Sequence, residues 1–301
     1  MIGTFDELIA AAKKGNRKRL AVPVCAQSDL DLIDKASIAG MIHPVYIGDP
    51  QQIEGALAKS GIGKMNLEIV EARDGAAAID TAVSLVKEKR ADILMQGSAD
   101  RNEFLAAILD QEKGILKKKF ASYVSVIQLF KSNKLILVTD TFINSCPGLA
   151  EKQCILENAI ELAAVLGIDA PKVSVLAAIE QVNPGIPSTL DAAILSKMSD
   201  RKQFGKAIVE GPLDIDCSLS HVAAERKGLK SVVTGNVDIY IVPEVDTGYL
   251  LAEMLVFFGN MRTAGIITGT ECPVLIDLPF VSYENRFVEI ALARVATGNG
   301  G

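Results

Sequence analysis

The tract from Ile208 to Gly269 constrains the fold more than any other part of the chain, because strand and helix signals alternate along it. Apolar runs such as IYIV and AGIIT are separated by segments with a helical period of apolar residues. Strands joined by helices of this length form a mainly parallel sheet with helices on both faces. Ligands bind such a sheet beyond the carboxyl ends of its strands, so the acids and small polar residues at those ends are candidates for a site.

The same alternation extends over the rest of the chain. We predict strands over residues 19–24, 43–47, 67–72, 91–95, 121–129, 135–139, 173–177, 207–210, 237–242, 264–268 and 273–277, with helices between most of them. Two of these strands, 121–129 and 135–139, follow each other across a short polar link without a helix. This interruption marks a place where the chain could change domains.

Composition excludes several classes of protein. The 301 residues are 49% hydrophobic, enough for two domains or one large one. A net charge of -6, few aromatic residues and no Trp argue against nucleic-acid binding. Five cysteines without a C-x-x-C pair and two distant histidines argue for reduced thiols and against a metal site. With no apolar run of membrane-spanning length and no signal-peptide core, we expect a cytoplasmic protein.

Two segments could contact an anion. Gly97 and Ser98 stand between a predicted strand and a helix, where a glycine lets the backbone approach a phosphate and a hydroxyl can add a hydrogen bond. Taken by itself, this pattern is better explained by an ordinary turn in which Ser98 or Asp100 caps the helix. Lys117–Lys119 could hold phosphate groups, although a solvated surface run is the usual explanation.

Further polar residues follow the predicted strands of the second half. Asp140 and Asn144 come after strand 135–139, while Asn183 and Ser196 follow strand 173–177. They could contact a substrate, or simply cap helices and close turns. Asp216 comes after strand 207–210 and begins a helix. Its carboxylate could be a helix cap worth about 1 kcal/mol, or it could receive a proton from a substrate thiol.

Several long segments resemble the phosphate acetyl/butyryl transferase family, in one order from about Asp92 to Pro273. The clearest are GSADRNEFLAAILDQEKGIL, EQVNPGIPSTLDAAILSKMSDR, GPLDIDCSLSHVAAERKGLKS and GNVDIYIVPEVDTGYLLAEMLVFF. The resemblance implies transfer of a short acyl group between coenzyme A and inorganic phosphate. It implies coenzyme A as a substrate, no tightly bound cofactor, no essential metal, and a homodimer or higher homo-oligomer.

The resemblance also implies two three-layer α/β/α domains with mainly parallel sheets around a cleft, as in isocitrate and isopropylmalate dehydrogenases. We place the first domain at residues 1–138 with 278–301 and the second at 139–277. The residues that match the family's motifs are expected to form the site. Catalytic roles fall to Asp216, Asn144 and Asn183, and substrate or phosphate binding to Gly97, Ser98, Lys117, Lys119, Asp140 and Ser196.

The chain departs from the family at one motif. Where members commonly carry Ser-Arg, it has Leu278 and Pro279, which can neither donate a side-chain hydrogen bond nor carry positive charge. The nearest cations are Lys117–Lys119 and Arg286. An acyltransferase with a rearranged phosphate site is the leading hypothesis. A non-catalytic paralogue that binds coenzyme A or an acyl phosphate is the alternative. A dehydrogenase ranks below both, because no G-x-G-x-x-G follows an early strand.

Overall fold

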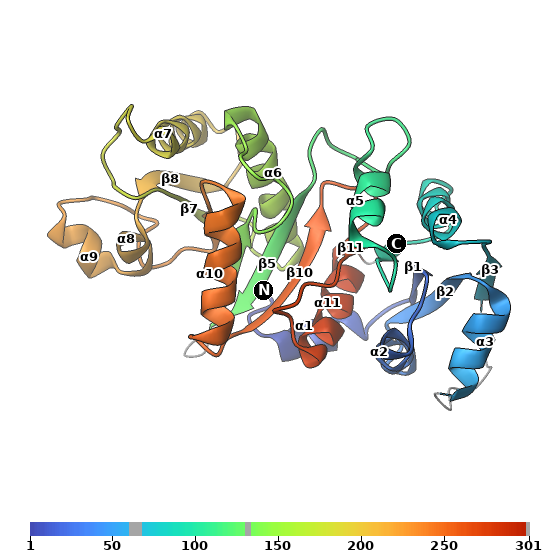
Figure 1. Ribbon diagram of the computed structural model, residues 1–301. Coiled ribbons are helices and arrows are strands. Elements are labelled where there is room, and N and C mark those ends of the chain that lie inside the picture. The colour runs from blue at the N-terminus through green and yellow to red at the C-terminus, as the bar shows by residue number, and fades with distance from the viewer. Residues whose placement is uncertain (60–67, 130–133, 299–301) are drawn as a thin grey trace. The chain divides into compact units, whose positions relative to one another are not determined.

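The computed structural model describes residues 1–59, 68–129 and 134–298, which form a mixed α/β fold (Figure 1). The chain divides into two compact units. The terminal unit contains Phe5–Lys119 and Ala264–Gly301, and the central unit contains Met1–Thr4 and Phe120–Thr263. In the described part of the chain, none of the helices combines the length and apolar character that crossing a membrane requires.

The terminal unit holds a sheet in the order β3-β2-β1-β4-β11-β10. Pairing is parallel from β3 to β11, and β10 is antiparallel to β11. The strands are β1 (Lys18–Pro23), β2 (Ile42–Gly48), β3 (Glu68–Glu71), β4 (Ile93–Met95), β10 (Arg262–Thr268, which begins in the central unit) and β11 (Val274–Leu275). The helices are α1 (Phe5–Ala12), α2 (Gln27–Ile38), α3 (Pro50–Lys59), α4 (Gly75–Lys87), α5 (Arg101–Leu109) and α11 (Tyr283–Ala296). One group of packed helices contains α1, α2 and α11, and another contains α4 and α5.

The central unit holds a sheet in the order β5-β6-β9-β7-β8. The strands β5 and β6 form an antiparallel pair, and the remaining pairs are parallel. The strands are β5 (Ser122–Gln128), β6 (Leu135–Thr139), β7 (Lys172–Leu176), β8 (Ile208–Leu213) and β9 (Ile239–Ile241). The helices are α6 (Leu149–Val165), α7 (Pro187–Asp200), α8 (Ile215–Leu219), α9 (His221–Arg226) and α10 (Val245–Phe257).

The predicted α/β class and mainly parallel pairing are confirmed, and each predicted strand overlaps an observed one. Residue 67 and most of the link between 129 and 135 lie outside the described residues. The helical segment predicted between β8 and β9 forms two short helices, α8 and α9. Ser220 separates them with extended backbone, and its hydroxyl caps α9 by accepting from the amide of Ala223.

The compact units divide the chain at residues other than the predicted domain boundaries of 138/139 and 277/278. Phe120–Thr139 belongs to the central unit because β5 pairs with β6 and β6 pairs with β9. Ala264–Asp277 belongs to the terminal unit because β11 pairs with β4. The β5–β6 hairpin therefore belongs to the central unit.

Tight backbone packing fixes the turn after β4. Gly97 has a φ of 60°, in the left-handed region that favours glycine. A Cβ atom here would lie 2.6 Å from the carbonyl oxygen of Pro23 and 2.7 Å from that of Val24. Both contacts are with backbone atoms, so rotating a side chain cannot relieve them. The turn after β4 therefore requires glycine at this position, where it packs against the end of β1.

We expect Gly97→Ala to lower the free energy of unfolding by about 3 kcal/mol, because a left-handed alanine and two backbone clashes add together. Gly40→Ala is the matched control, with a φ of 81° and open space around its Cβ position. It should cost only about 1 kcal/mol. Urea unfolding of both variants measures the difference, and equal losses would contradict this packing argument.

Candidate active site

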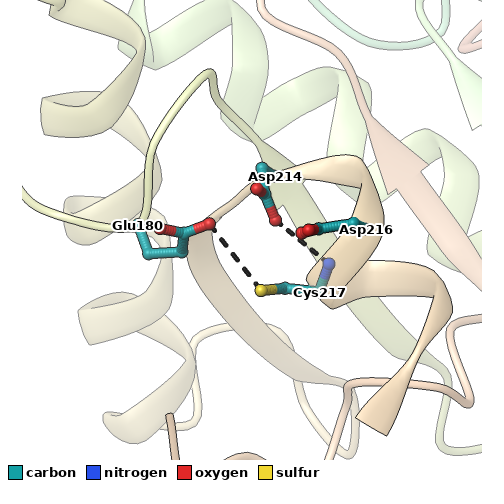
Figure 2. A group of neighbouring side chains, drawn as sticks. All are labelled: Glu180, Asp214, Asp216 and Cys217. Carbon is teal, nitrogen blue, oxygen red and sulfur yellow. Dashed lines mark hydrogen bonds between the residues drawn. The ribbon is translucent and has the colours of Figure 1, made fainter. Parts of the chain in front are cut away.

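Four side chains gather beyond the carboxyl ends of β7 and β8 in the central unit (Figure 2). Glu180 lies in the loop after β7, Asp214 directly follows β8, and Asp216 and Cys217 lie on α8. Their carboxylate oxygens and the Cys217 sulfur all lie within 4.8 Å of one another. Parallel pairing of β7 with β8 brings these residues together, although 37 positions separate Glu180 from Cys217.

The two aspartates of this group differ in their local roles. Asp214 is the N-cap of α8, and its Oδ1 accepts a hydrogen bond from the amide of Cys217 at 3.0 Å. Asp216 lies inside the first turn, and its side chain is 56% exposed. The capping role considered for Asp216 therefore belongs to Asp214. The carboxylate of Asp216 can face solvent and a substrate.

Lys227 joins the three carboxylates. Its Nζ donates to Glu180 Oε1 at 2.7 Å, to Asp216 Oδ1 at 3.0 Å and to Asp214 Oδ2. We call Glu180, Asp214, Asp216 and Lys227 the lysine-bridged acids. Sequence reasoning missed Lys227, because it follows α9 and no local pattern links it to Glu180, 47 positions earlier.

The pKa values in this group follow from the shared ammonium. The hydrogen bond from Lys227 holds the pKa of Glu180 below its usual range. Burial opposes the charged form of Asp214, but its hydrogen bonds within the group and to Lys227 outweigh burial and lower its pKa. The same bonds, that to Asp214 foremost, raise the pKa of Lys227. Burial, assisted by the nearby acids, raises the pKa of the Cys217 thiol to about 12.

This arrangement can hold a proton acceptor in place, but it is poorly suited to a metal. Carboxylate oxygens suit a hard cation. However, the Lys227 ammonium already lies within hydrogen-bond distance of all three acids and would repel such an ion. The Cys217 thiol stays protonated near neutral pH because of its raised pKa, so it is not a ready thiolate ligand.

Asp140 and Asn144 lie in the loop after β6, and their hydrogen bonds fix the backbone conformation of this loop. The buried Asp140 carboxylate accepts hydrogen bonds from the amides of Tyr123, Phe142 and Ile143, and from the amide and side chain of Asn144. Asn144 Nδ2 also donates to the carbonyl of Ala121 at 2.8 Å. Burial raises the pKa of Asp140 despite these hydrogen bonds.

Asn183 and Ser196 lie on either side of the start of α7. The exposed Asn183 accepts from the amide of Gly185 through Oδ1, and its own amide donates to Thr189 Oγ1 at 2.9 Å. Ser196 is half-buried in the second half of α7. Asn183 therefore shapes the turn that leads into α7.

The predicted anion contacts lie in the terminal unit. Ser98 is exposed, and its Oγ donates to Oδ2 of the buried Asp29 at 3.0 Å. Asp100, rather than Ser98, caps α5, which leaves the Ser98 hydroxyl for other contacts. The amide of Ser98 donates to the carbonyl of Val24, a β-branched residue with a left-handed φ of 49°. Such strained backbone is concentrated at functional sites.

Lys117 and Lys119 also lie in the terminal unit. Both side chains are exposed, in the segment that follows α5. The amides of Lys117 and Lys118 both donate to the carbonyl of Gly269, which ties this segment to the end of β10. The structure therefore joins Ser98 to Asp29 by a direct contact, and it places the two lysines on a separate segment of the same unit.

Comparison with known proteins assigns the family. The family model described as phosphate acetyl/butaryl transferase matches residues 64–293. The chain belongs to this family. It is 36% identical over 300 residues to a phosphate butyryltransferase of Clostridium acetobutylicum, covering 99% of this chain and 100% of the relative. A phosphate acetyltransferase of Rickettsia prowazekii is 34% identical over 270 residues, covering 87% and 77% of the two chains.

Solved structures agree with the family assignment. A branched-chain phosphotransacylase from Enterococcus faecalis V583 superposes with a TM-score of 0.81 at 29% identity, covering 94% of this chain and 100% of that one. A putative 4-hydroxythreonine-4-phosphate dehydrogenase from Salmonella typhimurium gives a TM-score of 0.56 at 12% identity, covering 93% and 100%. The second likeness shows the fold alone. It is compatible with the predicted dehydrogenase-like architecture.

The pKa shifts of the lysine-bridged acids make their stabilising effect dependent on pH. Because the pKa of Glu180 is lowered in the fold, its contribution is present above its ordinary value of 4.5 and is lost as the pH falls through the lower folded value. The raised pKa of Lys227 keeps its ammonium charged up to its ordinary value of 10.5, so the ion pairs contribute wherever the acids are also ionised.

We expect Lys227→Met to lower the melting temperature at pH 7, where the ion pairs are formed, and to have a much smaller effect at pH 3. Melting curves of wild type and variant from pH 3 to pH 8 measure this difference. Lys197→Met is the control, because Lys197 pairs only with Asp200 among the ion pairs of the described residues and lies on an exposed helix face. A Lys227→Met effect that is independent of pH would contradict the assignment.

Proposed function

We propose that this family member transfers a short acyl group between coenzyme A and inorganic phosphate. An oxygen of hydrogenphosphate attacks the thioester carbonyl carbon, the carbon–sulfur bond breaks, and the proton of hydrogenphosphate ends on the departing sulfur. Acyl-CoA and hydrogenphosphate thus give an acyl phosphate and free coenzyme A. The observation that carries the proposal is the match to a phosphate butyryltransferase along the whole chain.

The positions of two predicted residues support roles in this reaction. Asp216 carries an exposed carboxylate oriented by Lys227, and we assign it the proton exchange with the coenzyme A sulfur. Ser98 carries an exposed hydroxyl beside Asp29, and we assign it a hydrogen bond to the phosphate or the carbonyl oxygen, which forms when the hydroxyl turns from Asp29 to the substrate. Asp140, Asn144 and Asn183 are assigned to shaping the loops around the substrates. Coenzyme A acts here as a substrate and not as a resident cofactor.

The proposal also includes the oligomeric state of the protein and its cellular location. We propose a cytoplasmic homodimer or higher homo-oligomer. One face of α10 exposes Leu250, Met254 and Phe257, with Phe258 just beyond it, and this apolar stripe supports a contact between copies. Sedimentation equilibrium should give a multiple of the 32.0 kDa chain mass, and a mass of one chain would overturn this part of the proposal.

The activity is tested by following thiol release from acetyl-, propionyl- and butyryl-CoA. Release that requires phosphate and yields one acyl phosphate per thiol supports the proposal. Absence of phosphate-dependent release with all three thioesters rejects it in this form. The non-catalytic alternative gains no support from the relatives, whose names are those of transferases.

We expect Asp216→Asn to lower kcat by about 100-fold or more, the range for losing a general acid or base. Glu225→Gln is the matched control, because Glu225 is also an exposed carboxylate near this end of the unit and pairs only with His221 among the ion pairs described. Its kcat should stay within a factor of two. Equal kcat values for both variants would remove Asp216 from the reaction.

A further inference from the structure

The segment after β11 offers no cation of its own. Asp277 is followed by Leu278 and Pro279. The Leu278 side chain is buried at 1% exposure and packs as an apolar core residue, while Pro279 is exposed. A phosphate approaching this segment needs a positive group from elsewhere in the terminal unit, because neither side chain can donate a hydrogen bond.

Arg286 brings a guanidinium to this segment from the first turn of α11. Its Nη1 lies 3.5 Å from Oδ1 of Asp29, and its Nε lies 3.6 Å from Oδ1 of Asp277. The positive charge therefore lies beside the residue that precedes Leu278. Arg101, at the start of α5, donates through Nη2 to the carbonyl of the same Asp277 at 2.5 Å. Two arginines from different helices thus converge on the segment after β11.

The contacts of Arg286 leave it able to bind another anion. Both ion pairs are longer than a charge-assisted hydrogen bond of 2.7–2.9 Å. Its Nε is buried and has no hydrogen-bond partner among the described residues. Leaving a buried donor unpaired is unfavourable, so a further acceptor at this atom would be stabilising.

Asp29 connects Arg286 to the predicted anion contact at Ser98. One carboxylate oxygen of Asp29 accepts from Ser98 Oγ, and the other faces Arg286. Asp29 is buried and fixed in the first turn of α2, where it also accepts from the amide of Ala26. A serine hydroxyl and a guanidinium are thereby held on two sides of one rigid acid. By contrast, Asp277 is half exposed and can turn away into solvent.

We propose that Arg286 is the phosphate-binding cation of this enzyme. In the absence of phosphate, the Asp277 carboxylate pairs with the Arg286 guanidinium, and phosphate takes its place. This inference rests on the proposed transferase function. A guanidinium presents paired donors to two oxygens of one phosphate, a geometry that lysine lacks. Arg286 thus supplies the charge that Leu278 and Pro279 cannot.

The test compares Arg286→Gln with wild type in the thiol-release assay. The KM for phosphate should rise by about 10- to 100-fold, the range for losing a charge-assisted hydrogen bond, while the KM for acyl-CoA changes less than threefold. Arg286→Lys keeps the positive charge and is less disruptive to folding. Its KM for phosphate should lie between those of wild type and Arg286→Gln. Asp277→Asn should lower the KM for phosphate by about two- to fivefold, because it removes a competing exposed ion pair.

The matched control is Arg294→Lys, a buried arginine two turns further along α11 whose Nη2 donates to the carbonyl of Lys14. It should leave the KM for phosphate unchanged. If Arg286 merely holds α11 in place, both Arg286→Gln and Asp277→Asn would lower stability and raise both KM values, which overturns the proposal. Pro279→Arg added to Arg286→Gln should recover part of the phosphate affinity.

Calorimetry with inorganic phosphate separates this inference from the proposed function. Turnover with an unchanged KM for phosphate in Arg286→Gln would reject the role of Arg286 and leave the transferase in place. If no thioester turns over, the transferase proposal fails. In that case, phosphate binding to wild type but not to Arg286→Gln still supports a phosphate site at Arg286. Equal binding to both proteins, or binding to neither, rejects this site.

Discussion

Parallel pairing of strands is the constraint on which the rest of this structure depends. It directs the carboxyl ends of β1, β4 and β11 to one edge of the terminal sheet, and those of β7 and β8 to one edge of the central sheet. Residues far apart in sequence meet at each edge. The lysine-bridged acids gather at one edge, and Ser98, Asp29 and Arg286 gather at the other.

Different interactions fix the side chains of these two clusters. In the central unit the ammonium group of Lys227 pairs with three carboxylates. It orients the most exposed of them, Asp216, and leaves that carboxylate accessible to solvent. In the terminal unit a single buried acid, Asp29, orients a hydroxyl and a guanidinium. In the proposed reaction these contacts hold Asp216 and Arg286 in place before substrate arrives, and such preorganisation lowers a reaction barrier.

Local patterns in the sequence predicted much of the fold but only part of the site. The strands and most helices could be predicted because apolar periodicity is a local property, as in IYIV before α10. Asp216 and Ser98 could be selected because they follow strands directly. Lys227 and Asp29 could not, since Lys227 pairs with Glu180, 47 positions away, and Asp29 with Ser98, 69 positions away. The assignment of β5 and β6 to the central unit also depends on tertiary contacts.

Hydrogen–deuterium exchange with and without coenzyme A and phosphate tests the central claim most directly, because it reports on each sheet edge separately. The account predicts slower exchange in two segments when both substrates are present: Gln96–Arg101 after β4, and Ile215–Arg226 over α8 and α9. Substrate-dependent protection confined to other segments, with these two unchanged, would contradict the claim that the chemistry lies at the carboxyl ends of these strands.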